Sequence, residues 1–207
     1  MGASYPELYV RASDFAGQMR WLATHGYHAV TLRQAYDYWR LGKRLLTHPV
    51  VITFDDGYRS DYTVGLPILR RRGWVGVLNL AVEHEWVDLP PRFIWRLVAA
   101  GWELDSHTLT HVDLTGVDAV QLQKEVAGSR AFLRRQYHQP IAFFCYPAGR
   151  YDDAVVASVR RAGYLAATTT NYGLASPRQG LLTLDRVRIN GSDGVAGFAS
   201  KLRALAA

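Results

Sequence analysis

Hydrophobic and polar positions along the chain follow two periods, one typical of buried strands and one typical of amphipathic helices. The continuous apolar run Val50-Val51-Ile52-Thr53-Phe54 predicts a strand covered on both faces, as in a parallel sheet. Other stretches carry apolar residues on one side only and are bounded by Ser, Asp or Gly, which predicts helices. In the first of these, Phe15, Met19 and Leu22 share one face and Ser13 is the expected N-cap.

Taken together, the pattern predicts helices and strands in regular alternation. Strands are expected over residues 28–32, 49–54, 75–82, 102–105, 141–146, 164–169 and 184–189, and helices over residues 14–25, 32–41, 62–72, 93–100, 118–137, 153–162 and 193–205. Pro67 is expected to break the third helix or to give it an irregular start. This rhythm indicates βα units and a mostly parallel sheet, either open or closed into a barrel.

Length and composition add broad limits. The 207 residues suit a single domain, 1–207. The net charge is +6, but the basic residues are scattered and no nucleic-acid motif is visible, so no nucleic-acid partner is expected. Binding to an anionic polymer such as a cell wall stays open as an alternative. One cysteine excludes a disulfide within the chain. No apolar stretch reaches the roughly 18 residues of a membrane span, and residues 1–10 lack the features of a signal peptide.

Polar clusters follow three of the predicted strands. Asp55 and Asp56 end the first, His107 and His111 follow the strand at 102–105, and the segment 146–149 follows the strand at 141–146. In parallel α/β folds these strand ends open on one face, so the three clusters are expected to converge.

Two of these clusters suggest a metal site. Adjacent carboxylates repel each other unless a cation or a difference in environment separates their roles. His107 and His111 are four apart, which on a helical turn places both imidazoles on one side. Two histidines with one carboxylate and open positions form a catalytic zinc pattern that also suits other divalent metals. The alternatives are an ordinary Asp-Asp-Gly turn and a surface histidine pair.

Thr53-Phe54-Asp55-Asp56-Gly57-Tyr58 and Ser106-His107-Thr108-Leu109-Thr110-His111 resemble two signature motifs of the polysaccharide deacetylase family, which is carbohydrate esterase family 4 or the NodB-homology domain. The likeness runs from about Tyr5 to Leu205. It implies an α/β fold, a distorted (β/α) barrel with about seven strands. A subgroup of the family often begins with one more strand before the segment matching Tyr5, so the barrel here has a gap or has been trimmed.

The resemblance also implies roles for individual residues. Asp55 corresponds to the general base that activates the attacking water. Asp56, His107 and His111 correspond to the metal ligands, with Zn²⁺ the usual metal and Co²⁺, Ni²⁺ or Mn²⁺ as alternatives. The backbone amide of Ala148 corresponds to the donor that stabilises the oxyanion.

The chain departs from the common family pattern in two places. Cys145 stands where many relatives have an arginine that orients the base, and Arg186 or Arg150 is expected to supply the missing charge. For Arg186 the alternative is a surface position at a strand edge, and for Cys145 it is a small buried apolar residue. The histidine that serves as general acid in many relatives is absent from Leu184–Gly191, which leaves that role unassigned.

The predicted activity is hydrolysis of N-acetyl groups on an N-acetylglucosamine-type polymer or oligomer, with O-acetyl esters as a close variant. Tyr58, Tyr146 and Pro147 are the predicted substrate-binding residues. Trp74, Trp86 and Trp95 line a sugar groove or pack in the core. The family favours a secreted or cell-envelope location; the oligomeric state is left open.

Two other functions remain open from the sequence. One is a carbohydrate-binding protein that has kept the deacetylase scaffold but lost catalysis, which the missing arginine and histidine suggest. The other is a metallohydrolase that acts on a non-sugar amide.

Overall fold

A curled sheet of six parallel strands forms the centre of the protein, as seen in a computed structural model that describes residues 6–83 and 88–206. Neighbouring strands follow one another in the chain, in the order β3-β4-β5-β6-β7-β8. A separate pair, β1 and β2, is also parallel. The strands are β1 (His28–Val30), β2 (Pro49–Val51), β3 (Thr53–Asp56), β4 (Val77–Leu80), β5 (Glu103–Ser106), β6 (Phe143–Cys145), β7 (Ala166–Tyr172) and β8 (Leu184–Arg186).

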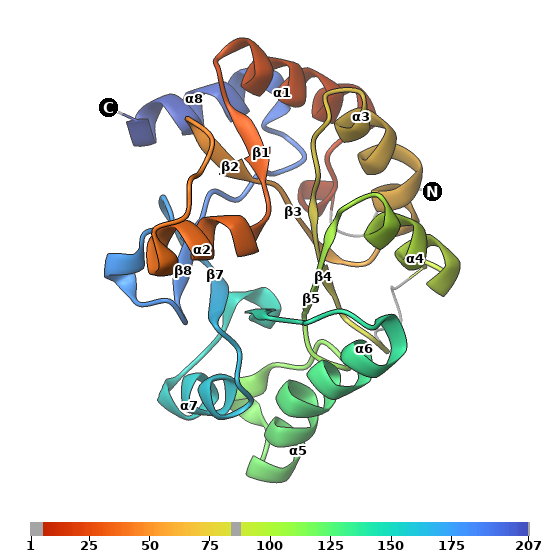
Figure 1. Cartoon of the computed structure of the whole chain (residues 1–207), viewed down its shortest axis with the longest axis vertical. Coiled ribbons are helices and arrows are strands. Elements are labelled where there is room, and N and C mark those ends of the chain that lie inside the picture. Colours follow the sequence, from red (N-terminus) through yellow and green to blue (C-terminus); the bar gives the residue numbers. More distant parts are fainter. Residues whose placement is uncertain (1–5, 84–87, 207) are drawn as a thin grey trace.

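Helices surround the strands and make the outer layer (Figure 1). They are α1 (Ala12–Thr24), α2 (Leu32–Leu41), α3 (Leu66–Arg70), α4 (Pro91–Ala99), α5 (Ala119–Gln123), α6 (Ser129–Tyr137), α7 (Asp153–Arg161) and α8 (Gly194–Ala206). Local sequence explains several helix ends: Thr31 and Gln34 form a capping box on α2, and Asp152 caps α7. Within the described ranges, no helix is long and apolar enough to cross a membrane. The predicted fold class, a distorted barrel of parallel strands and helices, is confirmed.

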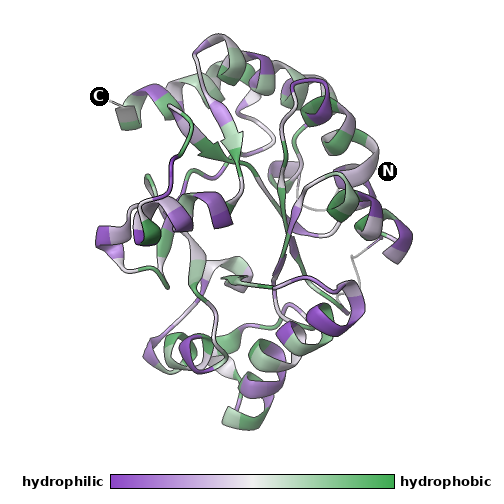
Figure 2. Cartoon of the chain, in the orientation of Figure 1, coloured by the Kyte–Doolittle hydropathy of each residue, from purple (hydrophilic) through white to green (hydrophobic). Residues whose placement is uncertain are grey.

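The pleat of the strands divides the core into two parts. Leu78, Leu104 and Phe144 belong to a large cluster with apolar residues of the surrounding helices. Val77 and Phe143 belong to a second cluster that also contains Leu32 and, at its edge, other apolar residues of α2. Because successive residues of a strand face opposite sides, the two clusters lie on opposite faces of the sheet, and α2 packs against the face that carries Val77 and Phe143. Figure 2 shows the apolar residues gathered on the strands and the inner sides of the helices.

Further toward the C-terminal ends of the strands, the positions on the inner face of the sheet are polar. Asp55 is in register with Asn79, and Asn79 is in register with Asp105. Cys145 on β6 is in register with Thr168 on β7. The sheet therefore carries a row of polar side chains beyond its inward apolar residues. This row lies toward the C-terminal ends of the strands, where the predicted functional residues lie.

The structure differs from the predicted elements in three respects. The strand predicted over 49–54 divides at Ile52, because β2 pairs with β1 while β3 pairs with β4. Ser13 lies inside α1, whose N-cap is Arg11. The helix predicted over 118–137 is continuous but contains a π-helical turn, η4 (Lys124–Gly128), between α5 and α6. The expectation for Pro67 is met, because this residue lies in the first turn of α3, directly after another π-helical turn, η2 (Asp61–Gly65).

Candidate metal centre

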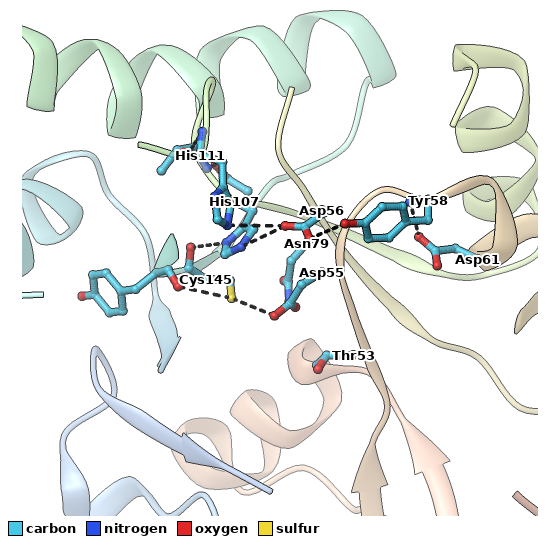
Figure 3. Close-up of polar contacts among 12 residues, drawn as sticks. Thr53, Asp55, Asp56, Tyr58, Asp61, Asn79, His107, His111 and Cys145 are labelled. Carbon is cyan, nitrogen blue, oxygen red and sulfur yellow. Dashed lines mark hydrogen bonds and ion pairs between the residues drawn. The ribbon is translucent and has the colours of Figure 1, made fainter. Parts of the chain in front are cut away.

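Three predicted ligands converge at the C-terminal ends of β3 and β5. Asp56 is the last residue of β3, and His107 and His111 lie in the segment after β5. Oδ1 of Asp56 is 3.5 Å from Nε2 of His107 and 3.5 Å from Nε2 of His111 (Figure 3). The three ligand atoms all lie within 4.8 Å of one another. The strand ends therefore bring together the two-histidine, one-carboxylate set predicted from the sequence.

His107 is oriented through its second ring nitrogen. Nδ1 lies 2.7 Å from the backbone carbonyl oxygen of Cys145, which can only accept a hydrogen bond. In the neutral ring, Nδ1 therefore carries the proton and Nε2 presents its lone pair toward Asp56. Metal-binding histidines are usually supported in this way. The side chain is only 3% exposed, so the surrounding core also limits its rotation.

The electrostatic potential at His107 is negative. Burial opposes protonation of the ring, but the neighbouring Cys145 and the carboxylates of Asp55 and Asp56 outweigh it and raise the pKa of His107 to about 9. A metal would compete with this proton for Nε2, because a histidine binds a metal only in its neutral form.

Asp56 gives a direct test of whether this site fits a metal. Its Oδ1 is buried and has no hydrogen-bond partner among the described residues, although a buried polar atom without a partner typically costs about 1–3 kcal/mol. Ligands bound about 2.1 Å from a tetrahedral zinc ion lie about 3.4 Å from each other, close to the 3.5 Å separations seen here. The residues therefore fit a divalent cation of the zinc class.

The histidine-bearing segment is an irregular loop, so the two imidazoles are brought together without the helical turn that their spacing of four would also suit. Thr108 and His111 have φ angles of 72° and 60°, in the left-handed region that non-glycine residues rarely adopt. Asp56 has a φ of 74°. Two of the three candidate ligands thus sit on a backbone that is strained by the order of 1 kcal/mol or more per residue, a feature that clusters at functional sites.

Glu125 holds this loop, although the sequence analysis did not select it. Its buried carboxylate accepts hydrogen bonds from the backbone N–H groups of Leu109 and Thr110, both at 2.9 Å. It also accepts from the Thr110 hydroxyl and the Gln121 amide, both at 2.8 Å. Glu125 lies in the π-helical turn η4. The helix thereby supplies the acceptor that the irregular loop lacks within itself.

Asp55 is held in a separate network beside the metal ligands. The guanidinium of Arg186 contacts both carboxylate oxygens at 2.9 Å, and the Asn79 amide donates to Oδ1 at 2.7 Å. Burial acts to raise the pKa of Asp55, but Arg186, His107 and Asn79 together hold it well below its usual range. Asp55 is therefore an ionised carboxylate at neutral pH, and its side chain is 33% exposed.

The two arginines that the sequence left open lie in different places. Arg186 reaches across from β8 to Asp55 and Thr53 on β3, with a bond of 3.2 Å to the Thr53 hydroxyl. Its side chain is 17% exposed, so it is not a surface residue at a strand edge. Arg150 instead pairs with Asp113 on the surface at 2.6 Å. Cys145 is fully buried, as its apolar alternative expects, with Sγ 3.7 Å from Asp55.

Tyr58 contacts the candidate metal ligand Asp56 rather than standing free in a groove. Its hydroxyl donates to Oδ2 of Asp56 at 3.2 Å. Burial, the hydroxyl of Tyr9 and the charge of Asp56 all raise the pKa of Tyr58, so the hydroxyl remains a donor at neutral pH. The substrate-binding role predicted for Tyr58 remains a prediction.

The segment after β6 forms a tight turn, η5 (Pro147–Gly149). Tyr146 and Pro147 are buried, and the Tyr146 hydroxyl donates to the Leu182 carbonyl at 2.9 Å, so neither side chain offers a surface for a sugar. This placement argues against the substrate contacts predicted for them. Ala148 is exposed, with a φ of 50°. A Cβ on Gly149 would lie 2.0 Å from Oγ1 of Thr170, so the turn can pack on β7 only through glycine.

The three tryptophans considered for a sugar groove have different settings. Trp74 is partly buried against the main core cluster. Trp95 is 39% exposed and its ring lies 5.5 Å from that of Tyr137. Trp86 lies outside the described residues. Trp74 and Trp95 therefore do not gather around Asp56.

Comparisons with known proteins agree with this arrangement. The sequence profile described as "Polysaccharide deacetylase" matches residues 43–167. The chain is 31% identical to YxkH of Bacillus subtilis, which bears that family's name, over 93% of this chain and 69% of the relative. It is 27% identical to the poly-beta-1,6-N-acetyl-D-glucosamine N-deacetylase of Escherichia coli K12, over 93% of this chain and 35% of that protein. The chain therefore spans about a third of the length of the second relative.

A solved structure has the same fold. The Streptococcus pyogenes deacetylase PplD in complex with acetate superimposes with a TM-score of 0.86 at 26% sequence identity. The superposition covers 93% of this chain and 87% of that protein.

Proposed function

Because this chain belongs to the polysaccharide deacetylase family, we propose that it is a metal-dependent hydrolase that removes N-acetyl groups from an N-acetylglucosamine-type polymer or oligomer. The observation that carries the proposal is the convergence of Asp56, His107 and His111 beside an ionised Asp55. Residues 1–207 act in this proposal as one deacetylase domain.

Asp56, His107 and His111 would hold the metal, with Zn²⁺ as the first candidate and Co²⁺, Ni²⁺ or Mn²⁺ as alternatives. When bound, a divalent ion supplies a Lewis acid for both the acetyl carbonyl and the attacking water.

Asp55 is the proposed general base. Its carboxylate takes one proton from the water as the oxygen attacks the acetyl carbon. Arg186 orients both oxygens, but it also keeps the pKa low and so makes Asp55 a weak base on its own. Once protonated, Asp55 is a carboxylic acid within the site and is proposed to return the proton to the leaving amine nitrogen. That step would fill the role left unassigned by the missing histidine.

The backbone N–H of Ala148 is proposed as the donor to the developing oxyanion. Its turn is fixed by Gly149, which packs against β7, and by a 3.3 Å bond from the Thr170 hydroxyl to the Ala148 carbonyl. A backbone donor does not depend on the side chain, so the small side chain of alanine does not weaken this role.

Support for the substrate comes from the relatives. The Escherichia coli relative is named for poly-beta-1,6-N-acetyl-D-glucosamine, and the Streptococcus pyogenes structure contains acetate, the expected product. We propose the same class of acetylated amino-sugar polymer as the partner of this chain. Such polymers lie outside the cytoplasm, so a secreted or cell-envelope location follows from the proposal.

The Arg186–Asp55 pair weakens the non-catalytic alternative. A missing arginine was one of the two reasons to consider a binding protein on a decayed scaffold, and Arg186 occupies that place with a two-point contact. A non-sugar amide substrate is distinguished from the sugar polymer by the substrate panel below.

The test is acetate release from N-acetylglucosamine oligomers, O-acetylated sugars and non-sugar acetamides. The chain is stripped by a chelator and reloaded with Zn²⁺ or Co²⁺. We expect metal-restored release from the oligomers, abolished in Asp55→Asn and Asp56→Asn and retained in the control Asp113→Asn, which weakens a surface ion pair with Arg150 and keeps an oxygen to accept from Thr115. No release from any amino sugar by the reloaded protein would overturn the proposal.

A further inference from the structure

A chain of two tyrosine hydroxyls leads from the surface to the candidate metal ligand Asp56. The hydroxyl of Tyr9 donates to that of Tyr58 at 3.3 Å, and Tyr58 donates to Oδ2 of Asp56 at 3.2 Å. The two rings meet edge to face, with centroids 5.4 Å apart. Because the carboxylate can only accept, the donor direction runs from Tyr9 through Tyr58 to Asp56.

This contact distinguishes the two oxygens of Asp56. Oδ1 is the atom 3.5 Å from both histidine nitrogens, and Oδ2 is the atom bonded to Tyr58. The terminal torsion of an aspartate is soft, so without a second anchor the carboxylate would rotate. The backbone of Asp56 is held by β4 and by a bond from the Ala81 N–H to its carbonyl at 3.1 Å, but this leaves the carboxylate torsion free. Figure 3 shows Tyr58 reaching Asp56 from the side opposite to the histidines.

Tyr9 comes from an N-terminal strap, defined here as residues 6–9, that is tied to the loop before α8. The Glu7 carboxylate accepts from the backbone N–H and hydroxyl of Ser192 at 3.2 and 2.6 Å. The Glu7 carbonyl accepts from the Gly191 N–H at 2.9 Å. A Cβ on Gly191 would lie 2.3 Å from the Pro6 carbonyl oxygen, so the strap and the loop are in backbone contact.

We propose that Tyr58 is a positioning residue for the metal centre, and that Tyr9 supports it from the strap. By holding Oδ2, Tyr58 keeps Oδ1 directed at the two imidazoles and so raises the affinity for the metal. This inference rests on the proposed function, because it assumes that Asp56 binds a metal. Loss of an outer hydrogen-bond partner typically weakens metal binding about 10- to 100-fold. We expect about 10-fold for Tyr58→Phe and a smaller loss for Tyr9→Phe.

The test is Co²⁺ titration of the chelator-stripped full chain, followed by the visible absorption of the bound ion. Tyr62→Phe is the matched control: it lies in η2, and its hydroxyl accepts from Arg96 rather than donating to Asp56. Thermal unfolding of each metal-free variant is measured in parallel. We expect Tyr58→Phe to weaken Co²⁺ binding and alter its spectrum while the metal-free unfolding temperature stays within a few degrees of wild type.

The outcomes separate the inference from the proposed function. Wild type that binds no Co²⁺, or Asp56→Asn that binds as tightly as wild type, would overturn the metal site itself. Wild type that binds through Asp56 while Tyr58→Phe matches both its affinity and its spectrum would overturn only the positioning role. A lower metal-free unfolding temperature with unchanged affinity would mean that Tyr58 serves packing alone, and would likewise overturn it.

Discussion

Replacing Glu125 by glutamine should loosen the histidine-bearing loop without removing any of the candidate metal ligands. Oε2 of Glu125 accepts the two backbone N–H groups of the loop, while Oε1 accepts from the Thr110 hydroxyl and the Gln121 amide. A glutamine keeps an oxygen at the first place and puts an NH₂ group at the second. The Thr110 hydroxyl can rotate and Gln121 can turn over to accept from it, so the fold should survive.

The expected cost follows from the loss of charge. Hydrogen bonds to charged groups contribute about 1.5–3 kcal/mol and neutral ones about 0.5–1.5 kcal/mol, a difference near 1 kcal/mol for each bond. Over the two backbone bonds, Glu125→Gln should lower the free energy of unfolding by about 2 kcal/mol. Glu125 is fully buried, so solvent screening does not reduce this value. Glu125→Ala would leave several buried donors without a partner and should unfold much of the chain.

Urea denaturation measures the stability, and Co²⁺ titration measures the effect on the site. Amide hydrogen exchange at Leu109 and Thr110 reports on the loop directly, and both amides should exchange faster in Glu125→Gln. The control is Glu83→Gln, because the side chain of Glu83 is exposed. If Glu125→Gln matched the wild type in stability, Co²⁺ affinity and exchange of these two amides, Glu125 would not hold the loop.

Three further substitutions test other parts of the site and the fold. Arg186→Met should lower kcat about 100-fold with little change in KM, since it frees the Asp55 carboxylate to rotate. Arg186→Lys should recover only part of the lost kcat, because lysine cannot contact both oxygens. A kcat of Arg186→Met within threefold of wild type would contradict this. Gly149→Ala should lower the free energy of unfolding, measured by urea denaturation, by about 2–4 kcal/mol. The control Gly73→Ala should lower it by about 1 kcal/mol, because Gly73 has a similar positive φ but nothing within 4 Å of the added Cβ. Equal losses would show that the contact with Thr170 is unimportant. Burial raises the pKa of Glu103 from 4.5 to about 7, so the folded chain binds more protons than the unfolded chain between those pH values, and the free energy of unfolding should fall as pH rises through that window. Glu103→Gln should flatten this decline when denaturation curves at about pH 5 and 8 are compared. An unchanged decline in the variant would count against this reasoning.

The residues of the candidate metal centre could be predicted from the sequence because each lies next to a strand with the pattern of a buried, parallel sheet. Once β3 and β5 are placed in one parallel sheet, Asp56 and the two histidines must open on the same edge. The conformation of the loop could not be predicted in the same way. Spacing of four residues suggests a helical turn, but the left-handed angles at Thr108 and His111 depend on contacts with Glu125 and β4.

The supporting residues escaped the sequence analysis for a related reason. Glu125 sits in a helix with an inserted π-turn, which shifts the side that each residue faces, so helical periodicity does not assign it to the loop. Asn79 lies within an apolar strand, and only the register with β3 brings its amide to Asp55. A polar residue inside an otherwise apolar strand was the available signal.

The bond from Arg186 to Asp55 joins positions 131 residues apart in the chain. A protein is synthesised from its N-terminus, and contacts this distant form only after the intervening segments have emerged and folded. On the ribosome, β3 and the histidine loop are therefore available well before β8 arrives to orient the carboxylate. The proposed base therefore gains its orienting partner only after β8 has emerged, and a polypeptide truncated ahead of β8 would carry the candidate metal ligands without the arginine that contacts Asp55.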